Sequence, residues 1–167
     1  MTYTKSPKPI FIIDRMIHGL ARWLRFLGFY SIHIEDMEHV ASIKNQYPNT
    51  IFITTSKKNF NKFGDYNAFL LKKNTIPEQL LELNNVFRIY KQIDLLSICS
   101  ICNIQIEPVN KDEIKNLIPD RVWNSFQTFW RCPKCQRIYW HGGHIERLIN
   151  KLRQMNVPLN KNQNSKK

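Results

Sequence analysis

Four cysteines, arranged as two Cys-x-x-Cys pairs, constrain the fold of this chain more than any other feature. The pairs are Cys99 with Cys102 and Cys132 with Cys135, and they contain every cysteine of the 167 residues. Each pair can place two thiolates in one tight turn, and two such turns form the tetrahedral sulfur shell that structural Zn²⁺ prefers. The pattern therefore predicts a four-cysteine zinc ribbon. A complete sulfur shell leaves no open coordination position, so this zinc would stabilise structure rather than do chemistry.

Two other interpretations of the cysteines stay open at this point. The 29 residues between the pairs exceed the usual spacing of a compact ribbon, so the thiols could be two reduced pairs or could form one disulfide. A redox site fits the sequence less well, because neither pair follows a strand and opens a helix. A basic chain without a secretory segment favours a metal over disulfides.

The residues before the cysteines alternate between strand and helix patterns. A continuous apolar run at 10–13 predicts a buried strand, and apolar residues at helical spacing over 15–27 predict an amphipathic helix that ends at Gly28. Further strands are expected at 30–34, 50–55, 68–71 and 86–90, and further helices at 36–46 and 77–83. Alternating strands and helices imply a parallel α/β sheet flanked by helices. Residues 10–94 therefore form the predicted first domain.

Three other segments complete the predicted organisation. Residues 1–9 are polar with two prolines and would form a basic N-terminal arm. Residues 95–155 would form the zinc ribbon and a C-terminal helix, because apolar residues recur at helical spacing from Ile145 to Met155. Residues 156–167 contain almost no apolar side chains and would form a polar tail.

The charge of the chain points to a polyanionic partner. Its 25 Lys and Arg residues outnumber 13 Asp and Glu residues, which gives a formal net charge of +12. Nucleic acid is the usual partner of such a chain. No apolar run reaches the roughly 18 residues of a membrane span, and no secretory segment opens the sequence. We expect a reducing compartment inside the cell, and a mitochondrial location is compatible with the charge.

Basic residues concentrate on the first helix and around the second cysteine pair. At 100° per residue, Arg15, Arg22 and Arg25 fall on one face, where a row of cations could follow a phosphate backbone. An ordinary solvated helix face is the alternative. Aromatic rings near the second pair offer stacking surfaces, although Trp130 and Tyr139 could instead form the core of the ribbon. The residues predicted to contact RNA phosphates are Arg15, Arg22, Arg25, Lys57, Lys58, Arg131, Lys134 and Arg137.

A series of motifs follows one order along residues 10–150. They are Ile12-Ile13-Asp14-Arg15-Met16, Leu20-Ala21-Arg22-Trp23-Leu24-Arg25-Phe26-Leu27-Gly28, Glu78-Gln79-Leu80, Cys99-x-x-Cys102-Asn103, and Cys132-x-x-Cys135 with Tyr139-Trp140-x-Gly-x-His144. Together they resemble the Mut-seven C-terminal RNase domain family. The resemblance implies a PIN-like nuclease fold with an attached zinc ribbon. It also implies that acidic residues at the carboxyl ends of parallel strands hold Mg²⁺ or Mn²⁺ for RNA hydrolysis.

The same resemblance indicates where the acidic site would lie and where this chain departs from it. Asp14 ends the first strand, where a first metal ligand is expected. After the third strand the family pattern resembles Thr-Arg-Asp, whereas this chain has Thr55-Ser56-Lys57. A lysine there would remove a ligand and oppose the binding of a cation. Asp14 could instead cap the helix that it precedes. If a catalytic site still assembles, its residues would be Asp14, Asp36, Glu38 and Asp65.

These observations favour a noncatalytic RNA-binding protein derived from a PIN-like ribonuclease family, a structural subunit of a ribonucleoprotein such as a ribosome. Its partners would be ribosomal or other structured RNA and neighbouring proteins, with no membrane. The alternative is an active ribonuclease that depends on Mg²⁺ or Mn²⁺. A third hypothesis is a protein-interaction module whose charge serves an acidic protein partner.

Overall fold

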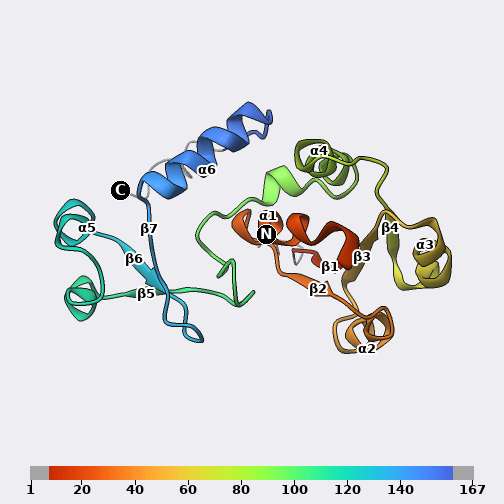
Figure 1. Ribbon diagram of the computed structural model, residues 1–167, viewed down its shortest axis with the longest axis horizontal. Coiled ribbons are helices and arrows are strands. Elements are labelled where there is room, and N and C mark those ends of the chain that lie inside the picture. The colour runs from red at the N-terminus through yellow and green to blue at the C-terminus, as the bar shows by residue number, and fades with distance from the viewer. Residues whose placement is uncertain (1–7, 160–167) are drawn as a thin grey trace, which may run out of the picture.

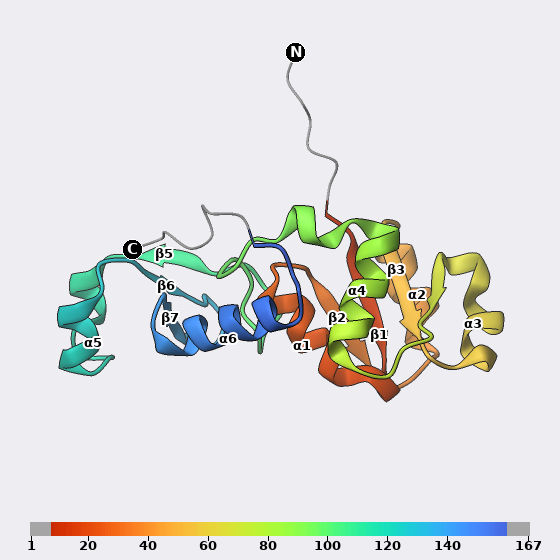
Figure 2. The ribbon, with the colours of Figure 1, turned by 90° about the horizontal axis from the view of Figure 1, so that it is seen from above.

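The computed structural model describes residues 8–159, which form an α/β unit followed along the chain by a smaller β unit. Figure 1 shows the two units arranged along the long axis of the molecule, and Figure 2 shows them from above. Most of the predicted N-terminal arm and polar tail lies outside the described residues. No helix within residues 8–159 is long and apolar enough to cross a membrane.

Four parallel strands form the sheet of the first unit, as the sequence predicts. They lie in the order β2-β1-β3-β4, and their bounds are β1 Ile10–Asp14, β2 Ser31–Ile34, β3 Thr50–Thr54 and β4 Ala68–Leu70. In the register of this sheet, Ile12 lies opposite Ile32 on one side and Phe52 on the other. Since all four strands are parallel, their carboxyl ends form one edge of the sheet, and Asp14 lies on that edge.

Helices cover both faces of the sheet. One face carries α1 (His18–Phe26), which follows the short 3₁₀ helix η1 (Arg15–Ile17), together with α4 (Ile76–Phe87) and α6 (Gly143–Gln154). The other face carries α2 (His39–Gln46) and α3 (Lys57–Phe63), and the 3₁₀ helix η2 (Gly64–Tyr66) leads from α3 to β4. Side chains alternate along β1, so Phe11 and Ile13 enter the first core and Ile12 enters the second.

The strand expected at residues 86–90 is wrong. Helix α4 continues to Phe87, and the chain then forms the 3₁₀ helix η3 (Ile89–Gln92). Arg88 ends α4 in a left-handed conformation with φ 53°. Phe87 packs against the rings of Phe11 and Phe69, whereas Val86 is exposed. Exposed Val86 and Arg88 alternate with Phe87 and Ile89, which pack inward, so the end of a helix shows the pattern that is typical of a short strand.

The second unit is an antiparallel ribbon with short helices between its first two strands. Its strands lie in the order β5-β6-β7, with bounds β5 Glu107–Val109, β6 Phe129–Arg131 and β7 Ile138–Trp140. The 3₁₀ helix η4 (Lys111–Ile114) and helix α5 (Asp120–Ser125) connect β5 to β6. The rings of Trp130 and Tyr139 pack with the buried cysteines, which confirms that they contribute to the core of the ribbon.

The last helix returns to the first unit. Ile145, Ile149 and Leu152 of α6 are buried in the core that α1 and α4 share, and Val157 follows them into it. Figure 2 shows α6 beside α1. In the sequence, the ribbon therefore lies between two parts of one α/β core, the first unit before it and α6 after it.

Candidate metal centre and nucleic-acid interface

The two cysteine pairs come together at one point of the ribbon. The four sulfur atoms all lie within 4.8 Å of one another, and the four thiols are free. Among the side chains that the structure describes, which do not include that of His144, they are the only group of three or more His, Cys, Asp or Glu close enough to share an ion. The predicted cluster is confirmed, and four thiolates at these distances can hold a metal ion.

Both cysteine pairs lie in turns of the same backbone geometry, which we call the first and second knuckles. In the first knuckle, the backbone N–H of Cys102 donates to the Sγ of Cys99 at 3.3 Å. In the second knuckle, the backbone N–H of Cys135 donates to the Sγ of Cys132 at 3.5 Å. The residue after each pair is left-handed, with φ 55° at Asn103 and 59° at Gln136. Backbone N–H groups aimed at sulfur favour the thiolate form, which is the form that binds a metal.

Cys99 is the thiol that ionises most readily. Burial raises its pKa, but hydrogen bonds from the hydroxyl of Tyr139 at 3.0 Å and from the backbone N–H groups of Cys102 and Ile101 outweigh burial and lower the pKa to about 6. Burial, followed by hydrogen bonds among the thiols, raises the pKa of Cys102 to about 12. Burial also raises the pKa of Cys132, against the opposing effect of backbone N–H groups of Cys135 and Lys134. A bound cation would replace these thiol protons, because the thiolate is the metal ligand.

Arg25 attaches the first knuckle to the α/β unit. Its Nε and Nη2 donate to the carbonyl oxygen of Ser31 at 3.0 and 2.7 Å, and its Nη1 donates to the carbonyl oxygens of Ser100 at 3.1 Å and Ile101 at 3.3 Å. The side-chain oxygen of Asn103 accepts a further bond, from the N–H of Ser31 at 2.8 Å. Burial lowers the pKa of Arg25, and the negative charge of nearby cysteine thiolates opposes that shift. The guanidinium donors of Arg25 are thus used within the protein.

Asp14 is fully buried at the carboxyl edge of the sheet. Its Oδ1 accepts a hydrogen bond from the backbone N–H of Met16 at 3.3 Å, which confirms the predicted capping role at the start of η1. Its Oδ2 accepts from the hydroxyl of Thr54 and from the side-chain amide of Asn59, the latter at 2.9 Å. The donors to the two carboxylate oxygens therefore come from three segments: η1, β3 and α3.

The other candidate acids do not assemble with Asp14 into a group of three. Asp36, Glu38 and Asp65 are all exposed, and the Oδ1 of Asp36 accepts from the backbone N–H of Glu38 at 2.9 Å. Within the described part of the chain, none of these carboxylates belongs to a cluster that could share an ion. Lys57, in the place where the family resemblance implies an acid, is the exposed first residue of α3.

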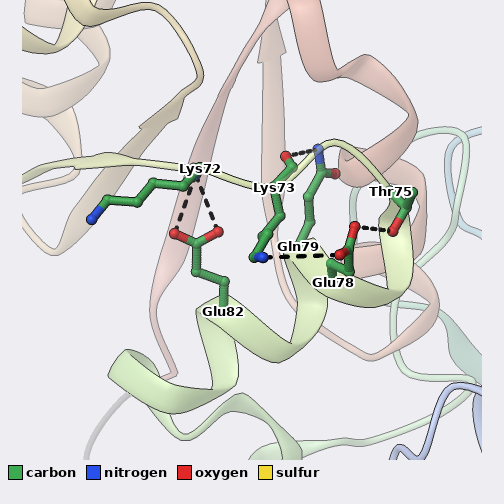
Figure 3. A network of polar contacts seen from close by, with 6 residues as sticks. All are labelled: Lys72, Lys73, Thr75, Glu78, Gln79 and Glu82. Atoms are coloured by element: carbon green, nitrogen blue, oxygen red, sulfur yellow. Dashed lines mark hydrogen bonds and ion pairs between the residues drawn. The ribbon is translucent and has the colours of Figure 1, made fainter.

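The Glu78-Gln79 motif shapes the connection between β4 and α4. Figure 3 shows Glu78 accepting a hydrogen bond from the hydroxyl of Thr75 at 2.6 Å, and this bond is the main cause that lowers the pKa of Glu78. The side-chain amide of Gln79 donates to the carbonyl oxygen of Lys73 at 3.1 Å. Both motif residues therefore stabilise the start of α4, where Glu78 occupies the third helical position.

The predicted basic face of α1 borders a groove of about 510 Å³. Exposed Arg15, His18 and Arg22 line it, together with His33 and Glu35 from the end of β2. Its wall also includes residues of the first knuckle, so the groove extends from the α/β unit to the ribbon. A continuous surface of this kind can follow a polymer across both units.

The other predicted phosphate contacts fall into two places. On the ribbon, Lys134 and Arg137 are exposed, while Arg131 forms an ion pair with Glu113 at 3.8 Å. Arg137 lines the same cavity as Arg22, so the structure brings these two predicted contacts together.

Lys57 and Lys58 are separated from that group. Both residues are exposed at the start of α3. Figures 1 and 2 both show α3 at the opposite end of the molecule from β7. An RNA that contacted both groups would therefore have to span the α/β unit.

Several residues that hold these sites in place carried no interpretable signal in the sequence. Thr54 and Asn59 satisfy Asp14 from positions far along the chain, and no motif marks Asn59. Ser31 likewise accepts hydrogen bonds from Arg25 and donates one to Asn103, and no local pattern in the sequence marks it. Only Asn103 could have been noticed, because Asn readily adopts the left-handed conformation that ends a tight turn.

The fold and the sites together define an α/β protein with an attached four-cysteine metal unit. The chain belongs to the Mut7-C RNAse domain family, whose profile matches residues 9–152. The matched range includes Asp14 and all four cysteines, and it confirms the resemblance seen in the motifs. Membership indicates a nuclease-derived function related to RNA. No curated protein and no solved structure matches the chain at a significant level.

Proposed function

We propose that this protein binds RNA without cleaving it and serves as a structural subunit of a ribonucleoprotein such as a ribosome. The environment of Asp14 carries the proposal. Thr54, Asn59 and the N–H of Met16 direct hydrogen atoms at its carboxylate, whereas a catalytic cation needs free oxygen lone pairs from several carboxylates. These three donors occupy most of the roughly four lone-pair directions of the carboxylate, which leaves little of it to bind a cation at this edge.

RNA binding is supported by the charge and by its placement. The formal net charge of +12 is the excess that remains after every Asp and Glu is counted against a Lys or Arg, so ion pairs within the chain cannot neutralise it. In this proposal Arg15, Arg22, Lys134 and Arg137 contact phosphates, while Arg25 links the first knuckle to the α/β unit. Lys57, Lys58 and Arg131 form outlying contacts. Such contacts release counterions, so RNA affinity should fall as salt rises.

The proposal includes Zn²⁺ as the ion held by the four cysteines. A tetrahedral shell of four soft thiolates is the typical structural zinc site. The ion would fix both knuckles, and with them the attachment made by Arg25. Free thiols and bound zinc belong to a reducing compartment, and the proposal covers the mitochondrion among such compartments.

One experiment reads binding and cleavage from the same samples. Labelled structured and single-stranded RNAs are incubated with wild-type protein, Asp14→Asn or the control Asp112→Asn, at an exposed carboxylate of the ribbon, in Mg²⁺, Mn²⁺ or EDTA. We expect intact RNA in every sample. We also expect binding to single-stranded RNA whose log–log salt slope is about −3, corresponding to roughly four phosphate contacts.

Three results would contradict the proposal. Metal-dependent cleavage that Asp14→Asn abolishes and Asp112→Asn retains would establish an active ribonuclease. A salt slope near zero would exclude phosphate contacts as the basis of binding. Partners that stay attached after RNase treatment of the purified complex would favour an acidic protein as the main partner.

A further inference from the structure

A second cavity lies where the two units meet. Its volume is about 620 Å³, and its walls come from α1, α5, β7 and α6. Cavities of roughly 300–1,000 Å³ are typical of sites for small organic ligands and nucleotides. The first unit supplies only Arg22, Phe26 and part of α6, so this cavity exists only because the ribbon is docked on the α/β unit.

Positive charge converges on this cavity from four separate elements. The exposed arginines that line it are Arg22, Arg121, Arg137 and Arg147. No described residue of its lining carries a carboxylate, and within residues 8–159 these guanidinium groups form no ion pair. Four uncompensated cations around one hollow indicate a ligand with phosphate groups.

The cavity also has aromatic walls. Phe126 and Trp140 line it and approach each other over Gly142, where an added Cβ would lie 2.3 Å from the indole nitrogen of Trp140 and 3.5 Å from the ring of Phe126. The absence of a side chain at Gly142 therefore allows Trp140 to occupy its place. Rings of this kind stack on nucleobases, and the stacking does not depend strongly on the base.

We propose that this cavity takes one unpaired nucleotide of a bound RNA, with its base on the aromatic wall and its phosphates among the four arginines. The inference rests on the proposed RNA binding and names the part of the RNA that is recognised. Arg22 lines both this cavity and the groove along α1, so the neighbouring backbone continues into that groove. Paired bases present only their edges, and an unpaired base alone exposes a face for stacking.

The test compares three hairpin RNAs that share one stem. The first carries a single bulged adenosine, the second carries an abasic residue at the bulge, and the third is fully paired. We expect wild-type protein to bind the bulged adenosine about tenfold more tightly than the abasic hairpin, as stacking of one base provides. The abasic and fully paired hairpins should retain the salt-dependent binding. Free AMP should bind more weakly than the bulged hairpin.

Two variants in the cavity and one control variant outside it test whether the preference for the bulged adenosine depends on the cavity. Arg147→Ala removes one lining charge, and Arg153→Ala removes the same charge from α6 at a residue outside this cavity. Gly142→Ala leaves the charge unchanged and displaces Trp140. We expect Gly142→Ala to reduce the preference for adenosine to below about threefold because it displaces the stacking ring. Arg147→Ala should do the same, because a nucleotide whose phosphate is not held in the cavity no longer places its base on that ring, and Arg153→Ala should keep the preference. Metal content and thermal melting of each variant report whether it is folded.

Each contrary result has a separate meaning. Equal, salt-sensitive binding of all three hairpins would overturn the nucleotide cavity while leaving RNA binding intact. Loss of the preference in Arg153→Ala to the same extent as in Arg147→Ala would assign it to overall charge and overturn the inference. Tighter binding of AMP than of the bulged hairpin would assign the cavity to a free nucleotide and overturn it as well. No binding to any RNA would overturn both this inference and the proposed function.

Discussion

The carboxylate of Asp14 connects three parts of the first unit through its two oxygens. The Oδ1 caps the turn that follows β1, while the Oδ2 receives donors 40 and 45 residues farther along the chain, from the end of β3 and from α3. A buried carboxylate is costly unless it is hydrogen-bonded, and here three donors supply those bonds. The hydrogen bonds around Asp14 therefore connect the end of β1 to β3 and α3.

Replacement of Asp14 should therefore be a stability defect. We expect Asp14→Ala to lower the free energy of unfolding by about 3 kcal/mol, because it leaves the donors of buried Thr54 and half-buried Asn59 without their acceptor. Urea unfolding followed by circular dichroism measures the change. The control Asp65→Ala, at an exposed carboxylate, should stay within about 0.5 kcal/mol of wild type. Full stability of Asp14→Ala would show that the network contributes little.

A second single position, Gly28, is set by both conformation and space. Its φ is +83°, and an added Cβ would lie 2.3 Å from the carbonyl oxygen of Asp94. We expect Gly28→Ala to cost at least about 2 kcal/mol of unfolding free energy. Gly64→Ala is the matched control, because Gly64 has a helical φ of −53° and no atom within 4 Å of the added carbon. Equal melting temperatures for the two variants would contradict this account.

At the scale of elements, α1 contributes different residues to two tasks. One face packs into the core through Leu20 and Leu24, while Arg25 reaches β2 and the first knuckle. We expect Arg25→Ala to lower the unfolding free energy by about 2 kcal/mol and to increase hydrogen exchange at the backbone amides of the first knuckle. The control Arg22→Ala, one turn earlier and exposed, should change neither quantity appreciably. Exchange at the knuckle that is unaffected by Arg25→Ala would show that the cysteine turn holds itself.

The predictability of the elements follows from how local their signals are. The parallel sheet could be predicted because short apolar runs alternate along the chain with helical segments, and α1 and α6 because their apolar residues recur at the period of a helix. Strands β5, β6 and β7 are three residues long, like β4, but no alternation with helices marks their places, so they could not be predicted. The false strand at 86–90 arose because partly buried Phe87, at a helix end, and buried Ile89, in a 3₁₀ turn, both pack into the core.

The candidate sites divide in the same way. The four-cysteine cluster could be predicted because each pair is local and metal chemistry fixes its spacing. The role of Arg25 could not, because the carbonyl oxygens of Ser100 and Ile101 lie 75 and 76 residues away. The cavity between the units depends on Arg121 and Arg147, which helical period alone does not distinguish from solvated surface residues. Contacts of this range are decided by tertiary packing.

At the scale of the whole molecule, the four-cysteine cluster and the proposed RNA surface share part of the chain. Ser100 lines both the groove along α1 and the cavity between the units, and it belongs to the first knuckle. We expect purified protein to contain about one zinc ion per chain, and Cys132→Ser or chelation to remove it. Loss of the ion should weaken RNA binding by about tenfold or more, since the knuckle that completes both hollows would lose its anchor.

Elemental analysis and RNA titration on the same samples measure this link. Restoring stoichiometric Zn²⁺ to chelated wild-type protein should recover RNA affinity, whereas the same addition to Cys132→Ser should recover less. RNA affinity that is unchanged in metal-free protein would show that the ribbon is docked without its ion.

The return of α6 to the α/β core has a consequence for how this protein is made. Translation proceeds from the N-terminus, so Leu20 and Leu24 emerge long before Ile149 and Leu152, with which they share one buried cluster. Until the last helix leaves the exit tunnel, the nascent chain holds an open apolar face, and such faces are prone to aggregate. The cysteine turns emerge during that interval. A metal bound by all four cysteines would close the loop between the two pairs. The chain that separates α6 from the first unit would then be shorter before α6 packs into the core.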